Sequence, residues 1–339
     1  MASTRDPSGV EYCELKNFTF ENGENLPIVR LAYRDFNPGG KKVALIPTCF
    51  RGRIKDTLNF TKGALQDHRV IVVALFGNGE SASPSNTANF PSNISYQDCV
   101  RAQHSLLTKH LSITTLDVVL GFSMGGQCTY HWAAMHPEMV QNAVVICSSA
   151  KTSLHNRQFL EGPKAALLHS IDYNDGHFTE NKVPIRGLHA FGRAYSAWLT
   201  SAEWFEKRLF EKQGFKTLEA WAEVVGGKNY EDWHPDNLLA MLGMWQRSDI
   251  SLTGRRSAEE TTLKAALRKL TANFLLMPCL TDQYFKWEAI KIEASFLQHG
   301  ELAIIPSVWG HIAGVEAVLT IPSGCTKGSN NFWVKFESA

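Results

Sequence analysis

Residues 116–127, with the sequence LDVVLGFSMGGQ, constrain the fold of this chain more than any other segment. A short apolar run leads directly into Gly121, Ser123 and Gly125, and residues 127–135 have helical character. This is the strand, sharp turn and helix of a G-x-S-x-G nucleophile elbow. The glycines leave room for a turn that holds the serine in a strained conformation with its oxygen above the sheet. The helix N-terminus would direct free N–H groups at the same place and stabilise a developing oxyanion.

The elbow motif alone does not establish a catalytic serine. Three fixed positions in five recur by chance, and glycines also let a strand turn into a helix without any catalytic role. The flanking strand and helix are the context that the motif requires. Whether Ser123 is a nucleophile therefore depends on whether the chain offers a base and a carboxylate in suitable places.

Short, continuously apolar runs recur in the first half of the chain, at residues 43–47, 68–76 and 141–147. Such runs are typical of parallel strands that are buried on both faces. Residues 96–110 show helical spacing, and residues 26–34 alternate like an antiparallel strand. Strands that alternate with helices predict an α/β fold with a mostly parallel sheet, which binds ligands beyond the carboxyl ends of its strands.

From residue 151 to about residue 270 the pattern becomes helical and rich in polar residues. We interpret residues 151–270 as an inserted helical cap over the catalytic edge of the sheet, because strand-like sequence resumes afterwards and needs the first half to pair with. The predicted core is therefore residues 1–150 and 271–339. Large aromatic side chains dominate protein cores. The tryptophans of this segment are accordingly predicted to form the core of the cap rather than a ligand cage, namely Trp198, Trp204, Trp221, Trp233 and Trp245.

A nucleophilic serine needs a base within reach of its hydroxyl. Among twelve histidines, His311 is the one in a glycine-flanked loop just after the last predicted strand, residues 302–306. A carboxylate must hold the other imidazole nitrogen, and Asp282 follows the preceding predicted strand, residues 272–279. Taken singly, Asp282 could be a helix N-cap and His311 an ordinary loop residue. Together with the elbow they stand in the order of an α/β-hydrolase triad, so we predict Ser123, Asp282 and His311 as the catalytic residues.

An oxyanion hole needs two backbone donors. One is predicted to be the N–H of Met124, the residue after the nucleophile, and the other should come from the loop after the first buried strand. Pro47 has no N–H, so Cys49 or Phe50 is the predicted second donor. The apolar Phe50 would also form a wall of the acyl pocket, and Trp309 is a second candidate for substrate binding.

Composition excludes several classes of partner. The 34 basic and 33 acidic residues give a formal net charge of +1, which leaves no electrostatic footprint for nucleic acid or an anionic membrane. No apolar run approaches the roughly 20 residues of a membrane-spanning helix. The polar first residues lack the apolar core of a signal peptide, so a cytoplasmic location is predicted.

No cofactor or metal is predicted. The seven cysteines are scattered and contain no C-x-x-C pair, which indicates free thiols rather than disulfides or a zinc site. The loop at residues 77–81 follows a strand, but it lacks the third spaced glycine of a dinucleotide-binding fingerprint.

Four stretches carry a resemblance to a known family: the elbow at residues 121–126, QDCVRAQ at 97–103, HPEMV at 136–140 and WGH at 309–311. They are similar to the homoserine O-acetyltransferase-like (MetX-like) branch of the α/β-hydrolase superfamily, and the similarity extends over nearly the whole chain. The resemblance implies an α/β-hydrolase fold with a helical cap. The nucleophile, acid and base of that family fall on the three residues already selected by position.

Two loops differ from the pattern of that family. True homoserine acetyltransferases carry a His-Ala-Leu-Thr-Gly-like segment where this chain has PTCFRG at residues 47–52. They also have a longer glycine-rich segment where this chain has a compact loop at residues 77–85. Both differences argue against homoserine and acetyl-CoA as substrates. The shorter form resembles MetX-like hydrolases and esterases, many of which are encoded in fungal genomes beside secondary-metabolite pathways.

We therefore predict a serine hydrolase of esterase type that cleaves an acyl bond of a small, fairly apolar molecule. The main alternative is an O-acyltransferase, which differs only in whether water or an alcohol attacks the acyl-enzyme. A lyase or cyclase that uses the His311 base without acyl chemistry is a third reading. A receptor built on the same fold is a fourth, against which the intact triad argues. The predicted partner is a small-molecule acyl substrate, and the resemblance suggests a homodimer.

Overall fold

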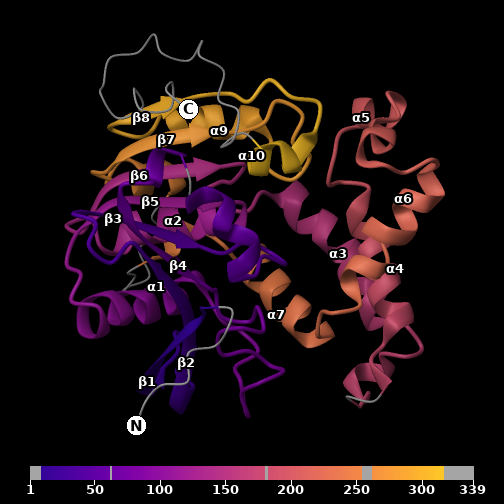
Figure 1. The fold of residues 1–339 in the computed structure, drawn as a ribbon, viewed down its shortest axis with the longest axis horizontal. Helices are drawn as coiled ribbons and strands as arrows, with labels where there is room; N and C mark the ends of the chain where they lie inside the picture. The colour runs from indigo at the N-terminus through magenta and orange to yellow at the C-terminus, as the bar shows by residue number, and fades with distance from the viewer. Residues whose placement is uncertain (1–8, 62, 180–181, 254–261, 317–339) are drawn as a thin grey trace.

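A computed structural model describes residues 9–61, 63–179, 182–253 and 262–316. At its centre lies an eight-stranded sheet with the order β1-β2-β4-β3-β5-β6-β7-β8. The six neighbouring strands β4, β3, β5, β6, β7 and β8 pair in parallel. The pairs β1–β2 and β2–β4 are antiparallel. The loops that follow the parallel strands therefore meet at one edge of the sheet (Figure 1). The predicted fold class is confirmed.

The middle of the sheet lies where the sequence predicts strands: β2 (Asn25–Phe36), β3 (Lys42–Pro47), β4 (His68–Val73), β5 (Leu116–Phe122), β6 (Val140–Ile146) and β7 (Asn273–Met277). β4 ends three residues before its apolar run does. The reason is that the N–H of Leu75 donates to the Thr48 hydroxyl (3.1 Å) instead of to a neighbouring strand. The central strands are thus predictable from their apolar runs, but their ends depend on loop contacts.

The two edges of the sheet differ from the prediction. The sequence pattern does not indicate β1 (Glu11–Thr19), because only Cys13 of its nine residues is buried. At the other edge the predicted strand 302–306 is displaced to β8 (Gly300–Leu302), and Ile305 forms only an isolated bridge with Cys279. An edge strand pairs on one side only. An apolar run there indicates burial without determining which residues join the ladder.

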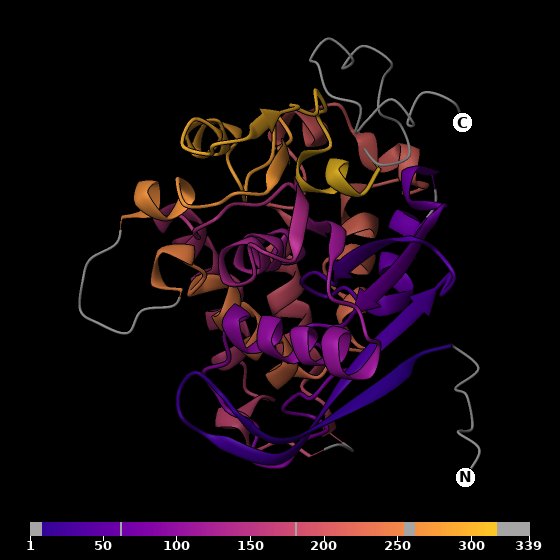
Figure 2. The same ribbon diagram turned by 90° about the vertical axis from the view of Figure 1, so that its left-hand side faces the viewer.

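Alternate residues of the central strands face two separate apolar clusters, as the period of a strand requires. Leu45 and Val119 face the cluster beneath α1 (Tyr96–Ser105), α2 (Met124–Met135) and α9 (Trp287–Ala294). Ile46 and Val118 face the opposite side, which is covered by η1 (Ile54–Thr61) and α10 (Ala313–Glu316). Figure 2 shows this layering, with the indigo β1–β2 hairpin along one edge of the molecule. The predicted helix 96–110 continues beyond α1 as a π-helical turn, η3 (Leu106–His110).

The described chain between β6 and β7 is helical and lies to one side of the sheet (Figure 1). Its helices are α3 (Leu154–Leu168), α4 (Ile185–Ser196), α5 (Ala202–Glu206), α6 (Leu218–Val225), α7 (Pro235–Gln246) and α8 (Leu263–Leu267). Trp204 and Trp221 form a small apolar cluster of their own, while Trp233 and Trp245 join the main cluster. Trp198 packs against the main cluster. These contacts agree with the prediction that the tryptophans build a core.

The chain leaves the sheet and returns to it at neighbouring points. Lys151 and Asp249 form an antiparallel bridge and an ion pair of 2.8 Å. On either side of it, the Thr152 N–H donates to the Ser248 carbonyl (2.9 Å) and the Ile250 N–H to the Ala150 carbonyl (3.1 Å). The division into a core, residues 1–150 and 271–339, and a cap, residues 151–270, stays a prediction, and residues 317–339 lie outside the described residues.

None of the described helices is long and apolar enough to cross a membrane. Six described cysteines are free thiols, as predicted, namely Cys13, Cys49, Cys99, Cys128, Cys147 and Cys279. Cys325 lies outside the described residues.

Glu293 of α9 fastens the chain at the point where it leaves the sheet. Its two carboxyl oxygens lie 3.0 and 3.2 Å from the backbone nitrogen of Ala150, and one of them lies 3.0 Å from the Tyr130 hydroxyl. The side chain is 5% exposed, and this burial raises the pKa of Glu293 to about 8, although the hydrogen bonds from Ala150 and Tyr130 oppose the shift. The carboxyl group is therefore mainly protonated in the folded protein at neutral pH.

This raised pKa makes stability depend on pH. An unfolded glutamate has a pKa of about 4.3, so between about pH 5 and 8 the folded chain keeps a proton that the unfolded chain releases. The free energy of unfolding should fall by about 1.4 kcal/mol per pH unit from this group, with the loss complete above about pH 8. In urea titrations, Glu293→Gln should flatten the slope and be more stable than wild type at pH 9. Glu288→Gln, on the exposed side of α9, should do neither; equal slopes for all three proteins would contradict the prediction.

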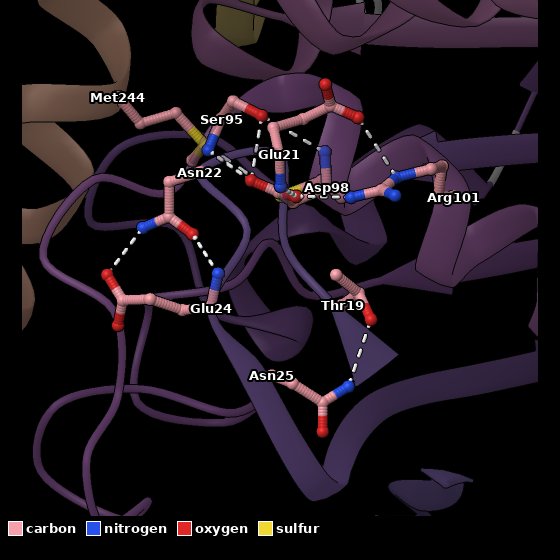
Figure 3. Close-up of polar contacts among 10 residues, drawn as sticks. Thr19, Glu21, Asn22, Glu24, Asn25, Ser95, Asp98, Arg101 and Met244 are labelled. Carbon is pink, nitrogen blue, oxygen red and sulfur yellow. Dashed lines mark hydrogen bonds and ion pairs between the residues drawn. The ribbon is translucent and has the colours of Figure 1, made fainter. Parts of the chain in front are cut away.

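Asp98, fully buried in the first turn of α1, joins that helix to the turn between β1 and β2 (Figure 3). Its Oδ1 accepts hydrogen bonds from the Glu21 N–H and the Arg101 guanidinium, each at 2.7 Å. Its Oδ2 accepts from the Ser95 N–H and hydroxyl, each at 2.8 Å. Ser95 in turn accepts from the Asp98 N–H, which completes a capping box.

Removing this carboxylate leaves several donors without a partner in the interior. Asp98→Ala should therefore lower the free energy of unfolding by about 3 kcal/mol or more. The matched control is Asn22→Ala, which breaks an exposed hydrogen bond to Glu24 in the same turn and should cost less than about 0.5 kcal/mol. Both free energies of unfolding come from urea denaturation. Similar losses in the two variants would show that the Asp98 network stabilises the fold no more than the exposed hydrogen bond does.

Candidate active site

The elbow has the geometry that its sequence predicts. β5 ends at Phe122, and Ser123 follows with a φ of 55° and a ψ of −122°, a strained backbone for a non-glycine residue. A Cβ on Gly121 would lie 2.1 Å from the Gly125 backbone, and one on Gly125 would lie 2.6 Å from the Pro47 carbonyl oxygen. Both positions therefore require glycine because of the close backbone approach. The helix begins at Met124, three residues before the predicted start.

The structure brings the three predicted catalytic residues into one hydrogen-bonded line. His311 Nε2 lies 2.9 Å from Ser123 Oγ, and His311 Nδ1 lies 2.8 Å from Asp282 Oδ2. The exposed fractions of Ser123, Asp282 and His311 are 2%, 1% and 4%. Such burial strengthens charged hydrogen bonds, because little water competes for them. A serine in this arrangement can lose its proton to the imidazole, and the carboxylate can stabilise the imidazolium that results.

Asp282 is oriented by the backbone that follows it. Its Oδ1 accepts from the N–H groups of Tyr284 (2.8 Å) and Phe285 (3.2 Å), which leaves Oδ2 directed at His311. Asp282 is not a helix N-cap, because the N-cap of α9 is Lys286, four residues later.

His311 is held by contacts from the core and from the segment between β6 and β7. Its N–H donates to the Leu199 carbonyl (3.1 Å), while its ring packs against those of Phe122 and Tyr284, at centroid distances of 4.8 and 4.7 Å. The preceding Gly310 has a φ of 62°, and a Cβ there would lie 2.7 Å from the Thr200 backbone. The loop can approach Thr200 this closely because residue 310 is glycine.

Sequence reasoning missed Cys147, which follows β6 beside the triad. Its sulfur, an Asp282 carboxylate oxygen and a His311 ring nitrogen lie within 4.8 Å of one another. Burial, followed by the Asp282 charge, raises the pKa of the thiol well above its usual value. A protonated thiol is a poor metal ligand, and the imidazole and carboxylate already bind each other. No sequence signal marked it, because only the pairing of β6 with β7 places its sulfur beside Asp282.

The predicted oxyanion loop lies against the elbow. A Cβ on Gly125 would meet the carbonyl oxygens of Pro47 and Thr48, at 2.6 and 3.2 Å, so this loop packs closely on the turn. Within the described part of the chain, the N–H groups of Met124, Cys49 and Phe50 donate to no backbone carbonyl. Their role in binding an oxyanion stays a prediction.

The two predicted substrate-binding residues occupy different surroundings. Phe50 is buried, and its ring packs against those of Tyr195 and Trp245 at centroid distances of 5.4 and 5.8 Å. Trp309 is half-buried and packs against Trp204 at a centroid distance of 6.0 Å. Neither role is decided by these contacts, so substrate binding by Phe50 and Trp309 stays a prediction.

Known proteins share this architecture and much of its sequence. A family model described as the alpha/beta hydrolase fold matches residues 38–181. Ethyl acetate hydrolase of Pseudomonas veronii is 29% identical over 305 residues, which is 86% of each chain. The crystal structure of the acetyl esterase MekB superposes with a TM-score of 0.84 at 28% identity, over 91% of each chain. This chain has the α/β-hydrolase fold.

A resemblance to the MetX-like branch is also found. A homoserine O-acetyltransferase of Chloroherpeton thalassium is 25% identical over 317 residues, which cover 86% of this chain and 82% of that one. Esterase relatives match over the same span with higher identity. The chain is a serine hydrolase of esterase type, and acyltransferases are among its relatives. Nothing in these similarities bears on the expected fungal origin or secondary-metabolite role.

The close backbone contact at the elbow can be tested by adding one methyl group. Gly125→Ala should push the Pro47 carbonyl away, displace the oxyanion loop, and lower kcat by about tenfold or more. Gly162→Ala in α3 is the matched control, since a Cβ there meets nothing within 4 Å apart from its chain neighbours and its own helix backbone, and kcat should stay unchanged. Steady-state kinetics and thermal melting distinguish the two; a fully active Gly125→Ala protein would contradict the contact.

Proposed function

We propose that this hydrolase cleaves esters of small acids, acetyl esters first among them, through an acyl-enzyme on Ser123. The observation that carries the proposal is the continuous hydrogen-bonded line from Ser123 through His311 to Asp282, buried at the loop edge of the sheet. Relatives named as an ethyl acetate hydrolase and an acetyl esterase support the acyl group. Bulky rings around Phe50 also support a small acyl group, because they restrict the space beside the oxyanion loop.

The chemistry follows from this arrangement. His311 Nε2 takes the Ser123 proton as the hydroxyl oxygen attacks the ester carbonyl carbon. The N–H of Met124, with that of Cys49 or Phe50, then binds the oxyanion. When the carbon–oxygen ester bond breaks, His311 gives the proton to the leaving alcohol. Water attacks the acyl-enzyme with the same base, which releases the acid and restores Ser123.

Transfer of the acyl group to an alcohol is the second candidate, because homoserine O-acetyltransferases are among the relatives. An alcohol competes with water only if the site raises its effective concentration far above that in solution. The two loops in which this chain departs from those enzymes, residues 47–52 and 77–85, lie at the edge of the sheet near the elbow. This departure favours hydrolysis.

Further expectations belong to the proposal. Residues 151–270 act as a cap that covers the site, in agreement with the low exposure of the three catalytic candidates. The chain works without a nucleic-acid partner or a membrane, in the cytoplasm and as a homodimer. No cofactor or metal is needed for the steps described.

The proposal is tested with purified protein, an acetyl ester such as p-nitrophenyl acetate, and the Ser123→Ala variant. Wild type should hydrolyse the ester, and the variant should lose about 10³-fold or more in kcat with an unchanged melting curve, since only the attacking oxygen is removed. Acetyl-CoA with homoserine should give no O-acetylhomoserine above background by mass spectrometry. A variant that keeps its activity would overturn the acyl-enzyme, and steady O-acetylhomoserine formation would overturn the hydrolase assignment.

A further inference from the structure

The loop between β3 and η1, residues 48–54, carries the predicted second oxyanion donor in a tight turn. The Gly52 N–H closes the turn by donating to the Cys49 carbonyl (2.9 Å), so Arg51 occupies its third position, with a φ of 54°. Turns with a positive φ at this position favour glycine, because a Cβ is strained there by on the order of 1 kcal/mol. The backbone alone would select glycine, so the Arg51 side chain must supply something that glycine cannot.

Arg51 reaches across to the segment between α6 and α7. Its guanidinium donates to the Asn229 carbonyl (2.5 Å), and its central carbon lies 4.0 Å from the centroid of the buried Tyr230 ring. A planar guanidinium suits both contacts at once, since it can stack on a ring while it donates in its own plane. The strained residue of the turn is thus tied to the cap.

Arg53, two residues later, makes the same pair of contacts to the next stretch of that segment. It donates to the Asp232 carbonyl (2.8 Å), pairs with the Asp232 carboxylate (3.2 Å), and lies 4.8 Å from the centroid of the Trp233 ring. Two arginines in one short loop therefore hold consecutive residues, 229–233, by backbone carbonyls and ring faces.

The sheet side of the loop is held separately, by the loop after β4. The buried Asn78 amide donates to the Gly52 carbonyl (3.3 Å) and to Glu80 Oε2 (3.1 Å), which also accepts the Ile54 N–H (2.8 Å). These contacts anchor Gly52 and Ile54. Cys49 also packs against the apolar cluster on the η1 side of the sheet, so Phe50 and Arg51, the tip of the turn, are the residues whose contacts lie on the cap side.

We propose that the cap positions the oxyanion hole of this hydrolase through Arg51 and Arg53, which act as positioning residues and do not touch the substrate. The inference rests on the proposed function, in which the N–H of Cys49 or Phe50 binds the oxyanion. Those donors must lie about 2.7–3.1 Å from the oxyanion in the transition state. Loss of the cap contacts lets the tip shift, which weakens binding of the transition state more than binding of the substrate and so lowers kcat rather than raising KM.

The decisive variant is Arg51→Gly, because it removes the side chain and also relieves the backbone strain. A role in stability alone predicts a changed melting temperature with full activity in the folded protein. The positioning role predicts a protein that is folded at the assay temperature, with kcat on p-nitrophenyl acetate lowered about tenfold or more and KM changed by less than about threefold. Binding of a trifluoromethyl ketone, which forms an oxyanion on reaction with the serine, should weaken by the same factor as kcat/KM.

Two further variants keep the test decisive. Arg53→Lys retains the charge but loses the planar contact with Trp233, and it should lower kcat in the same direction; it decides the matter if Arg51→Gly is unfolded at the assay temperature. Arg193→Ala is the control, because this exposed cap arginine pairs only with Glu223 among the described residues (2.9 Å) and should leave kcat unchanged.

The outcomes separate this inference from the proposed function. A kcat within about twofold of wild type in Arg51→Gly would overturn it, as would a rise in KM with kcat unchanged, which would mean that the arginine binds substrate. If Ser123→Ala remains active, the acyl-enzyme itself fails. If Ser123→Ala is inactive while Arg51→Gly is fully active, the hydrolase stands and only the positioning role is wrong.

Discussion

The backbone conformation of Ser123 is the constraint on which the site depends. Its φ of 55° and ψ of −122° cost on the order of 1–3 kcal/mol, and such a conformation persists only where the surroundings enforce it. Here the Ser123 N–H donates to the Ile146 carbonyl (2.9 Å) at the end of β6, while Gly121 and Gly125 allow the backbone to close around the turn. The buried sheet thus maintains the strain, and the serine hydroxyl stays within hydrogen-bonding distance of His311.

The parts of the site that can be predicted from sequence are those whose positions follow from the topology of a parallel sheet. Loops after such strands meet at one edge, so Asp282 and His311 could be selected from the residues that follow apolar runs. This works even though 188 residues separate Ser123 from His311. It works less well for lengths: the helix predicted over residues 127–135 begins at Met124, because helix ends depend on local capping and packing.

The remaining features depend on which distant segments pack together, and no local pattern reports that. Cys147 belongs to an ordinary apolar run, and only the pairing of β6 with β7 places its sulfur beside Asp282. Glu293 reads as a surface residue of an amphipathic helix until α9 packs against the chain at Ala150. Arg51 shows no periodicity or motif, and its conformation in the turn becomes informative only when the cap segment is seen against it.

The segment between β6 and β7, which is the predicted cap, contacts both halves of the proposed machinery and so ties specificity to rate. The Leu199 carbonyl accepts the N–H of His311, and residues 229–233 hold Arg51 and Arg53 of the oxyanion loop. A change in the cap therefore alters the placement of the base and of the oxyanion donors together with the space for substrate. An acceptor alcohol would have to be held above Ser123, where the cap lies, to compete with water.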